Sequence, residues 1–136
     1  NKTHIQHLGA VKIGNNTVIH ASTNVSRAMS FGDFTTIGDN VHIGIQTNIG
    51  HDVHIGADSD LSGHIFVGGR SRIGKKCWIS GGCVISQNLN IGDEVSIMLG
   101  SVVIKDISSG EKVSGNFAKD HFVNLKEYMR HQNALT

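Results

Sequence analysis

Apolar residues recur along this chain at every sixth position. Counting in sixes from Ile13 to Val103 reaches an aliphatic or aromatic residue each time, without one insertion. The next residue is glycine at nine of these sixteen positions, and the residue two places earlier is small or aliphatic, as at Thr35, Val41 and Thr47. A helix would repeat every ~3.6 residues and an amphipathic strand every two, so a period of six excludes both as long elements.

A period of six predicts short strands that alternate with tight turns. Each strand would direct two residues inward, and three such hexads would close one triangular coil. Successive coils would stack as parallel strands do, about 4.8 Å apart. The sequence therefore predicts an all-β fold, a parallel β-helix over residues 1–108, with Phe31 among its inward residues. Cys77 and Cys83 also fall at inward positions and are expected to be buried thiols.

The two ends of the chain depart from this repeat. Residues 1–8 fit it poorly, because His7 stands where an aliphatic residue is expected. Residues 109–136 begin with a turn sequence, after which Asp120 could cap a helix that reaches Gln132. The helix would lie against the coil or a neighbouring subunit and cover the open end of the last coil with an apolar face formed by Phe122, Leu125 and Met129.

Composition narrows the class of protein. Seventeen glycines without one proline fit many turns of one kind, and 38% hydrophobic against 5% aromatic residues indicates an aliphatic core. A net charge of +1 and the lack of a basic cluster argue against nucleic-acid binding. No apolar run approaches the roughly 20 residues that cross a membrane, and no signal peptide opens the chain, so a cytoplasmic protein is expected. The two cysteines match no zinc pattern.

The repeat resembles that of the hexapeptide-repeat acyltransferases. Residues 24–41 and 48–56 are similar to the UDP-3-O-acylglucosamine N-acyltransferases of lipid A synthesis. Residues 100–107, followed by 115–119, resemble the closing segment of acetyl-CoA-dependent sugar acetyltransferases of the sialic acid and bacillosamine types. The resemblance implies a left-handed coil, a homotrimer with sites at subunit interfaces, and acyl transfer to an amino group of a nucleotide-linked sugar in cell-envelope glycan or lipid A-type biosynthesis.

Both groups share a histidine followed by Asn or Asp, which here is His51-Asp52. The resemblance implies that His51 is the general base, a role that suits histidine because it exchanges protons near neutral pH. The acyl donor would be acetyl-CoA or an acyl-carrier thioester, with no metal. Asp52 could orient the imidazole. Gly69 stands three hexads, or one coil, beyond His51, and its N–H is a candidate oxyanion donor, as a backbone amide is in related sugar acetyltransferases.

Other candidates concern substrate and donor. Two coils beyond His51 stand Gln87 and Asn88, the second at the place of another histidine in the lipid A family, and both could hold the sugar. Gly81 marks a turn at a different corner, where a groove could admit the pantetheine arm. Lys105 and Lys119 are candidates for binding the phosphates of the donor.

Two alternatives remain beside acyl transfer. No cysteine or serine is placed beside a base as a covalent nucleophile, so an enzyme of this kind would transfer the acyl group directly in a ternary complex. The chain could instead be a non-catalytic trimeric β-helix scaffold. It could also resemble a γ-carbonic anhydrase, with His20, His51 and His54 as zinc ligands that converge across a subunit interface, although the spacing signature of those enzymes is absent.

Overall fold

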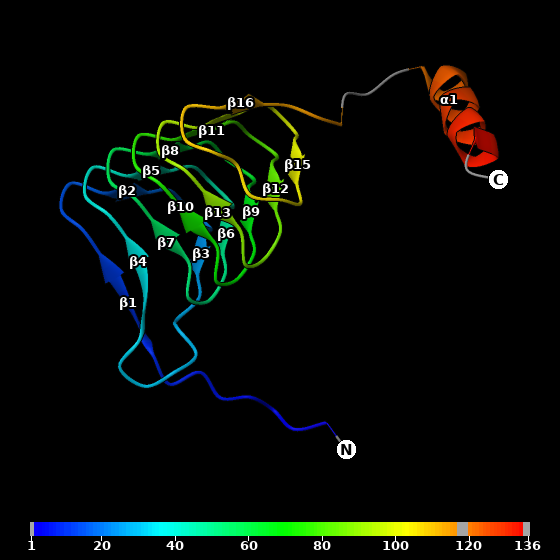
Figure 1. Cartoon of the computed structure of the whole chain (residues 1–136). Coiled ribbons are helices and arrows are strands. Elements are labelled where there is room, and N and C mark those ends of the chain that lie inside the picture. The colour runs from blue at the N-terminus through cyan, green and yellow to red at the C-terminus, as the bar shows by residue number, and fades with distance from the viewer. Residues whose placement is uncertain (1, 117–119, 135–136) are drawn as a thin grey trace.

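A computed structural model describes residues 2–116 and 120–134 of the chain, which wind into a left-handed parallel β-helix with one C-terminal helix (Figure 1). The strands are β1 (Ala10–Ile13), β2 (Val18–Ile19), β3 (Asn24–Val25), β4 (Phe34–Ile37), β5 (His42–Ile43), β6 (Asn48–Ile49), β7 (His54–Ile55), β8 (Asp60–Leu61), β9 (Phe66–Val67), β10 (Arg72–Ile73), β11 (Trp78–Ile79), β12 (Val84–Ile85), β13 (Asn90–Ile91), β14 (Ser96–Ile97), β15 (Val102–Val103) and β16 (Lys112–Val113). The helix is α1 (His121–Ala134).

Three parallel sheets form the sides of the coil. Sheet A has the order β1-β4-β7-β10-β13, sheet B the order β16-β14-β11-β8-β5-β2, and sheet C the order β15-β12-β9-β6-β3. From Ile37 to Val103 the aliphatic residues at every sixth position are all buried, as predicted. The described core is aliphatic and contains both thiols, Cys77 and Cys83, which are free and at most 2% exposed. Burial raises the pKa of each thiol.

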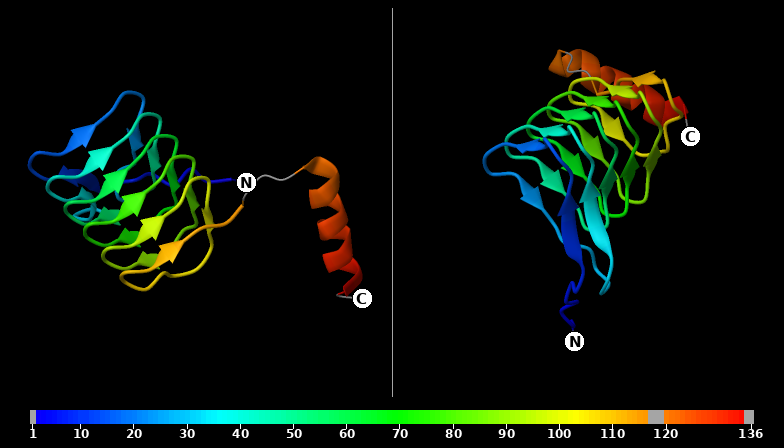
Figure 2. Two further views of the ribbon diagram at one scale, coloured as in Figure 1. Left: turned by 90° about the horizontal axis from the view of Figure 1, so that it is seen from above. Right: turned by 90° about the vertical axis from the view of Figure 1, so that its left-hand side faces the viewer.

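The first coil is longer than the repeat predicts. Ile13 pairs with Ile37 and Val25 with Ile49, a step of four hexads, whereas Ile37 pairs with Ile55, a step of three hexads. The prediction that Phe31 points inward is therefore wrong, and its side chain is 89% exposed. The extra hexad forms the loop of residues 26–33, beside which β1 and β4 extend beyond the coil (Figure 2). We call this segment the first-coil loop.

The last coil is shorter than the others. Ile91 bridges to Ile107 and Ile97 pairs with Val113, so each step falls two residues short of three hexads. The two residues by which this coil is shorter are missing from the turn after β15. The next inward residue, Ile107, therefore follows Val103 after four positions instead of six. Strand β16 then pairs with β14, and the coil continues past residue 108, where the hexad pattern ends.

Helix α1 has the predicted N-cap but not the predicted packing within one chain. Asp120 Oδ1 accepts hydrogen bonds from the N–H groups of Phe122 and Val123, both 3.1 Å. No residue of α1 is buried, and the helix stands apart from the coil in Figures 1 and 2. Its apolar side chains Phe122, Leu125 and Met129 are 44–70% exposed, so they do not cover the last coil of the same chain. The helix is too short and too polar to cross a bilayer.

Replacing Gly44 by alanine is expected to destabilise the coil by about 1–3 kcal/mol. A Cβ built at Gly44 lies 2.6 Å from the backbone nitrogen of Gly63 in the next coil, so the two coils would have to separate. The measurement is urea unfolding of both proteins. Ser62→Ala is the matched control, because position 62 already carries a Cβ at the same place in the repeat. Equal midpoints for Gly44→Ala and Ser62→Ala would contradict the close approach of the coils.

Candidate active site

His51 and Asp52 form a hydrogen-bonded pair at the turn between β6 and β7. The distance from His51 Nδ1 to Asp52 Oδ2 is 2.7 Å, and the two side chains are 31% and 20% exposed. Adjacent residues can face one another here because Asp52 adopts a left-handed backbone conformation with a φ of 58°. The carboxylate therefore holds the imidazole by Nδ1 and leaves Nε2 available for a substrate.

Backbone and side-chain groups fix the Asp52 carboxylate and main chain. The N–H of Asp52 donates to Oγ1 of the buried Thr35 at 2.9 Å. The N–H of Met29, in the first-coil loop, lies 3.3 Å from both carboxylate oxygens of Asp52. Because these contacts come from residues 29 and 35, which precede the pair by about one coil, the orientation of the imidazole depends on how the coils stack.

Gly69 lies directly against the His51 ring. A Cβ built at Gly69 would be 2.7 Å from Nε2, and its three nearest atoms all belong to this imidazole. Among the described residues, the N–H of Gly69 donates to no acceptor, while its carbonyl accepts the N–H of Asn88 at 3.0 Å. Gly69 thus combines contact with the imidazole of His51 and a backbone N–H without a partner among the described residues, which makes this N–H a candidate oxyanion donor.

Several predicted residues share this corner of the coil, and others do not. The N–H of Arg70 donates to the carbonyl of His51, and the N–H of Asn88 to that of Gly69, so successive turns stack in register. Gln87 and Asn88 are exposed in the turn after β12, and Lys105 is exposed in the turn after β15. Gly81 lies at a different corner, between β11 and β12, near Gly63 and Leu99. Lys119 lies outside the described residues.

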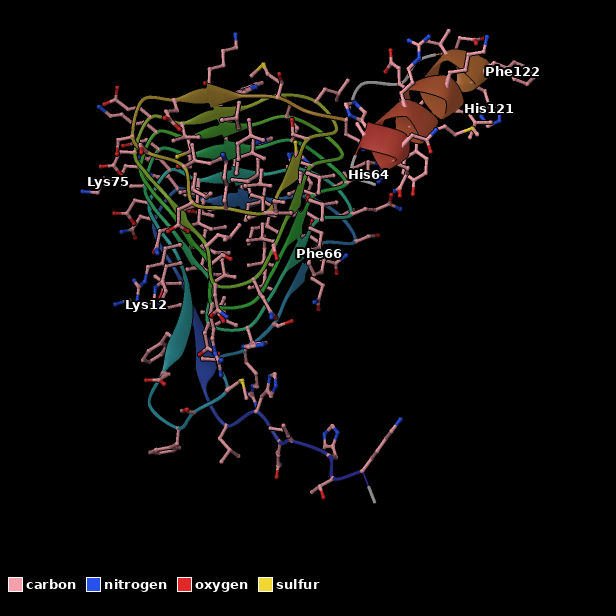
Figure 3. The ribbon with its side chains drawn as sticks, turned by 45° about the vertical axis from the view of Figure 1, so that its right-hand side comes forward. Lys12, His64, Phe66, Lys75, His121 and Phe122 are labelled. Carbon is pink, nitrogen blue, oxygen red and sulfur yellow. The ribbon has the colours of Figure 1, made fainter. Side chains whose placement is uncertain are left out.

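An apolar groove opens on the sheet C side of this corner. Its volume is about 390 Å³. The outward side chains of β9, β12 and β15 form its floor, and Figure 3 shows the first of them, Phe66, projecting from the coil. These side chains, Phe66, Val84 and Val102, are 42–51% exposed. The groove reaches the corner at Gly68, Gly69 and Gln87.

His7 also lies at the candidate site, although the sequence analysis gave it no role there. Its half-buried ring meets the His51 ring edge-on, with centroids 5.3 Å apart and an angle of 72°. The N–H groups of Leu8 and Gly9 donate to the carbonyls of Met29 and Ala28, both at 2.9 Å, and so attach the N-terminal segment to the first-coil loop. The signal in the sequence was the departure of His7 from the hexad pattern, which did not reveal its partner.

Within one chain, the three histidines considered for zinc lie at different places on the coil. His51 lies at the corner after β6, His54 lies on β7 in sheet A, and His20 follows β2 in sheet B. His20 instead contacts His42, with 2.7 Å between their Nε2 atoms, and His42 Nδ1 lies 3.1 Å from Asp60. In the described part of the chain, no three histidine, cysteine or acidic side chains are placed to share a metal ion.

Comparison with curated proteins finds related sequences over most of the chain. No protein-family model matches it. UDP-3-O-acylglucosamine N-acyltransferase of Bordetella parapertussis is 33% identical over 111 residues, which are 82% of this chain and 30% of that protein. The protein of the same name from Delftia acidovorans is 34% identical over 126 residues, covering 85% of this chain and 34% of that one. The chain therefore spans about a third of the length of these curated relatives.

Solved structures share the fold. LpxA from Acinetobacter baumannii superposes with a TM-score of 0.78 at 25% identity, over 92% of this chain and 49% of that one. The acetyltransferase domain of PglB from Neisseria gonorrhoeae gives 0.62 at 23%, over 83% and 58%. PerB from Caulobacter crescentus, solved with CoA and GDP-perosamine, gives 0.53 at 22%, over 82% and 52%. In sequence and in fold, the chain is therefore a hexapeptide-repeat β-helix similar to this group of acyltransferases.

Proposed function

We propose that the chain catalyses acyl transfer from a CoA or acyl-carrier thioester to an amino group of a nucleotide-linked sugar. The observation that carries the proposal is the His51-Asp52 pair, with Nε2 of His51 against Gly69, whose N–H has no partner among the described residues. A base and an oxyanion donor at one point are the two groups that aminolysis of a thioester needs. The Bordetella and Delftia relatives support the acyl transfer and the amino acceptor.

The proposed reaction is a direct attack of the sugar amine on the thioester of the donor. The amine attacks the thioester carbonyl and forms the C–N bond, while the carbonyl oxygen gains negative charge that the Gly69 N–H stabilises. Nε2 of His51 takes the proton that the amine loses, and Asp52 stabilises the imidazolium through Nδ1. The C–S bond then breaks, and the imidazolium returns the proton to the leaving thiolate. No covalent acyl-enzyme forms along this route.

The surroundings of the His51-Asp52 pair support a binding place for each substrate. The apolar groove along Phe66, Val84 and Val102 would take the acyl and pantetheine part of the donor, since both are largely apolar. Gln87 borders that groove and Asn88 is the next residue. Each could donate hydrogen bonds to the sugar or accept them from it. Lys105, Gly81 and Lys119 would contact the remainder of the donor. In a homotrimer, a neighbouring subunit would close the groove and complete the site.

A donor and acceptor panel tests this function. The purified chain is mixed with acetyl-CoA, a longer acyl-CoA or an acylated carrier protein, and with UDP- or dTDP-linked amino sugars, and thiol release is followed. We expect release that depends on the amino sugar, with UDP-glucose as the matched acceptor that lacks the amine. A trimer in light scattering that releases no thiol with any amino acceptor would favour the non-catalytic scaffold instead.

A further inference from the structure

A second cavity lies on the other side of the His51 corner from the apolar groove. It has a volume of about 370 Å³ and opens between the first-coil loop and the outer face of sheet A. Asp52 forms part of its wall, so the cavity reaches the pair that includes His51. Its lining is mostly polar and charged, and consists of Met29, Ser30, Asp33, Phe34, Asp52, His54, Arg70 and Arg72.

In the part of the chain that the structure describes, the two arginines of this cavity, Arg70 and Arg72, have no carboxylate partner. Among the described residues, neither guanidinium lies within 4.0 Å of an acidic oxygen, and the side chain of Arg70 contacts Met29 Sδ at 3.6 Å. Asp52 is already bonded to His51 and to the N–H of Met29. Asp33 belongs to the exposed first-coil loop at the rim. Unpaired guanidinium groups around a cavity are suited to an anionic ligand, above all phosphate, which they bind through paired N–H groups.

His54 completes the polar wall without adding a positive charge. Burial, and secondly the charge of Arg72, lower the pKa of His54, while Asp52 acts in the opposite direction. The imidazole is therefore neutral around pH 7 and can donate or accept one hydrogen bond per nitrogen. The positive charge of the cavity comes from Arg70 and Arg72 alone.

We propose that Arg70 and Arg72 bind the diphosphate of the nucleotide-linked acceptor. The proposal rests on the proposed function, and the position of the cavity favours the acceptor over the donor. Arg70 directly follows Gly69, and its N–H is bonded to the carbonyl of His51. The apolar groove opens on the Gly69 side of this corner and the arginine cavity on the Asp52 side. A thioester arm from the first and an anionic sugar from the second would meet at the imidazole.

Binding of diphosphates to charge variants tests the site directly. The probes are UDP, GDP and inorganic pyrophosphate, titrated calorimetrically into the whole chain. The double variant Arg70→Asn/Arg72→Gln should bind UDP at least about tenfold more weakly than the unchanged chain, because it loses charge-assisted hydrogen bonds. Asparagine is chosen at position 70 because φ is 63° there, a conformation that asparagine tolerates. Asp33→Asn should bind UDP a few times more tightly, because one negative charge leaves the rim.

The control removes the same charge elsewhere. Lys76→Asn/Lys112→Gln takes two positive charges from a left-handed turn position, with φ of 54°, and from an outward strand position, neither of which lines the cavity. Its UDP affinity should equal that of the unchanged chain. Absence of UDP binding to the unchanged chain, or equal weakening in both double variants, would overturn the proposal.

Steady-state kinetics distinguish the diphosphate of the nucleotide sugar from the phosphates of the CoA donor as the group bound in the cavity. In acyl transfer, Arg70→Asn/Arg72→Gln should raise KM for the nucleotide sugar at least about tenfold and leave KM for acetyl-CoA unchanged. A rise in KM for acetyl-CoA alone would place the phosphates of the donor in the cavity and overturn the assignment. The binding assay does not need turnover, so arginine-dependent UDP binding in a chain without transfer activity would refute the proposed function and leave the diphosphate site standing.

Discussion

The His51→Ala variant is expected to lose between about 10²-fold and 10⁴-fold in kcat for acyl transfer. This is the range that a positioned general base contributes, and alanine has no group that can take the proton of the amine. The fold should be retained, because the His51 side chain is a third exposed and no part of the hydrophobic core. Steady-state thiol release with saturating donor and acceptor measures the loss.

A second histidine provides the control for this variant. His64 is exposed in a turn at another corner of the coil, where Figure 3 shows it away from Lys75 and the sheet A side. It has a φ of 59°, so His64→Asn removes an imidazole without straining the turn. Activity of His64→Asn should equal that of the unchanged chain. If His51→Ala kept a normal kcat while its circular dichroism was unchanged, His51 would not be the base.

The Gly69→Ala variant is expected to lose roughly a hundredfold in kcat with almost no change in stability. The added Cβ would stand 2.7 Å from Nε2 of His51, so the imidazole must move away from Gly69, and the proposed base would leave the proposed oxyanion donor. Displacements of about 1 Å at a reacting group can cost this much. The backbone need not move, because the three nearest atoms to the new methyl group are all in the His51 ring.

The comparison with two other glycines isolates the cause. At Gly115 an added Cβ meets no atom of the described residues within 4 Å, so Gly115→Ala should keep full activity and stability. Gly44→Ala, in contrast, is expected to lose stability because its Cβ meets backbone atoms. Thermal unfolding and kcat are measured for all three. A Gly69→Ala protein with full kcat would show that the position of the imidazole against Gly69 does not matter for transfer.

The hexad pattern identified the coil because burial imposes it. Each inward aliphatic is surrounded by the same two sheets in every coil, so the same residue type is required at every sixth place. The confirmed span runs from Ile37 to Val103. Stacking also explains why Gly69 could be placed next to His51 from the sequence, since residues three hexads apart occupy equivalent positions once the coils are regular.

The pattern failed where an apolar residue fitted the count without being buried. Phe31 and Gly32 continue the period of six, yet they belong to the first-coil loop. A periodic sequence cannot distinguish a hexad that forms one side of the coil from a hexad that forms a loop outside it. In both cases the later hexads continue at the same spacing of six residues. The consequence reaches the candidate site, since this loop supplies the Met29 N–H to Asp52 and one wall of the arginine cavity.

The sequence by itself determined the β-helix, the burial of Cys77 and Cys83, and the corner that holds His51 and Gly69, because all three depend on a repeat that burial enforces. Only the tertiary structure decided that Asp52 turns back onto His51, since this depends on a left-handed φ and on contacts with Thr35 and Met29 in the preceding coil. It also decided that α1 stands clear of the coil, and that Arg70 and Arg72 face one cavity. Such contacts join residues whose spacing carries no period, so they exist only once the coils are stacked.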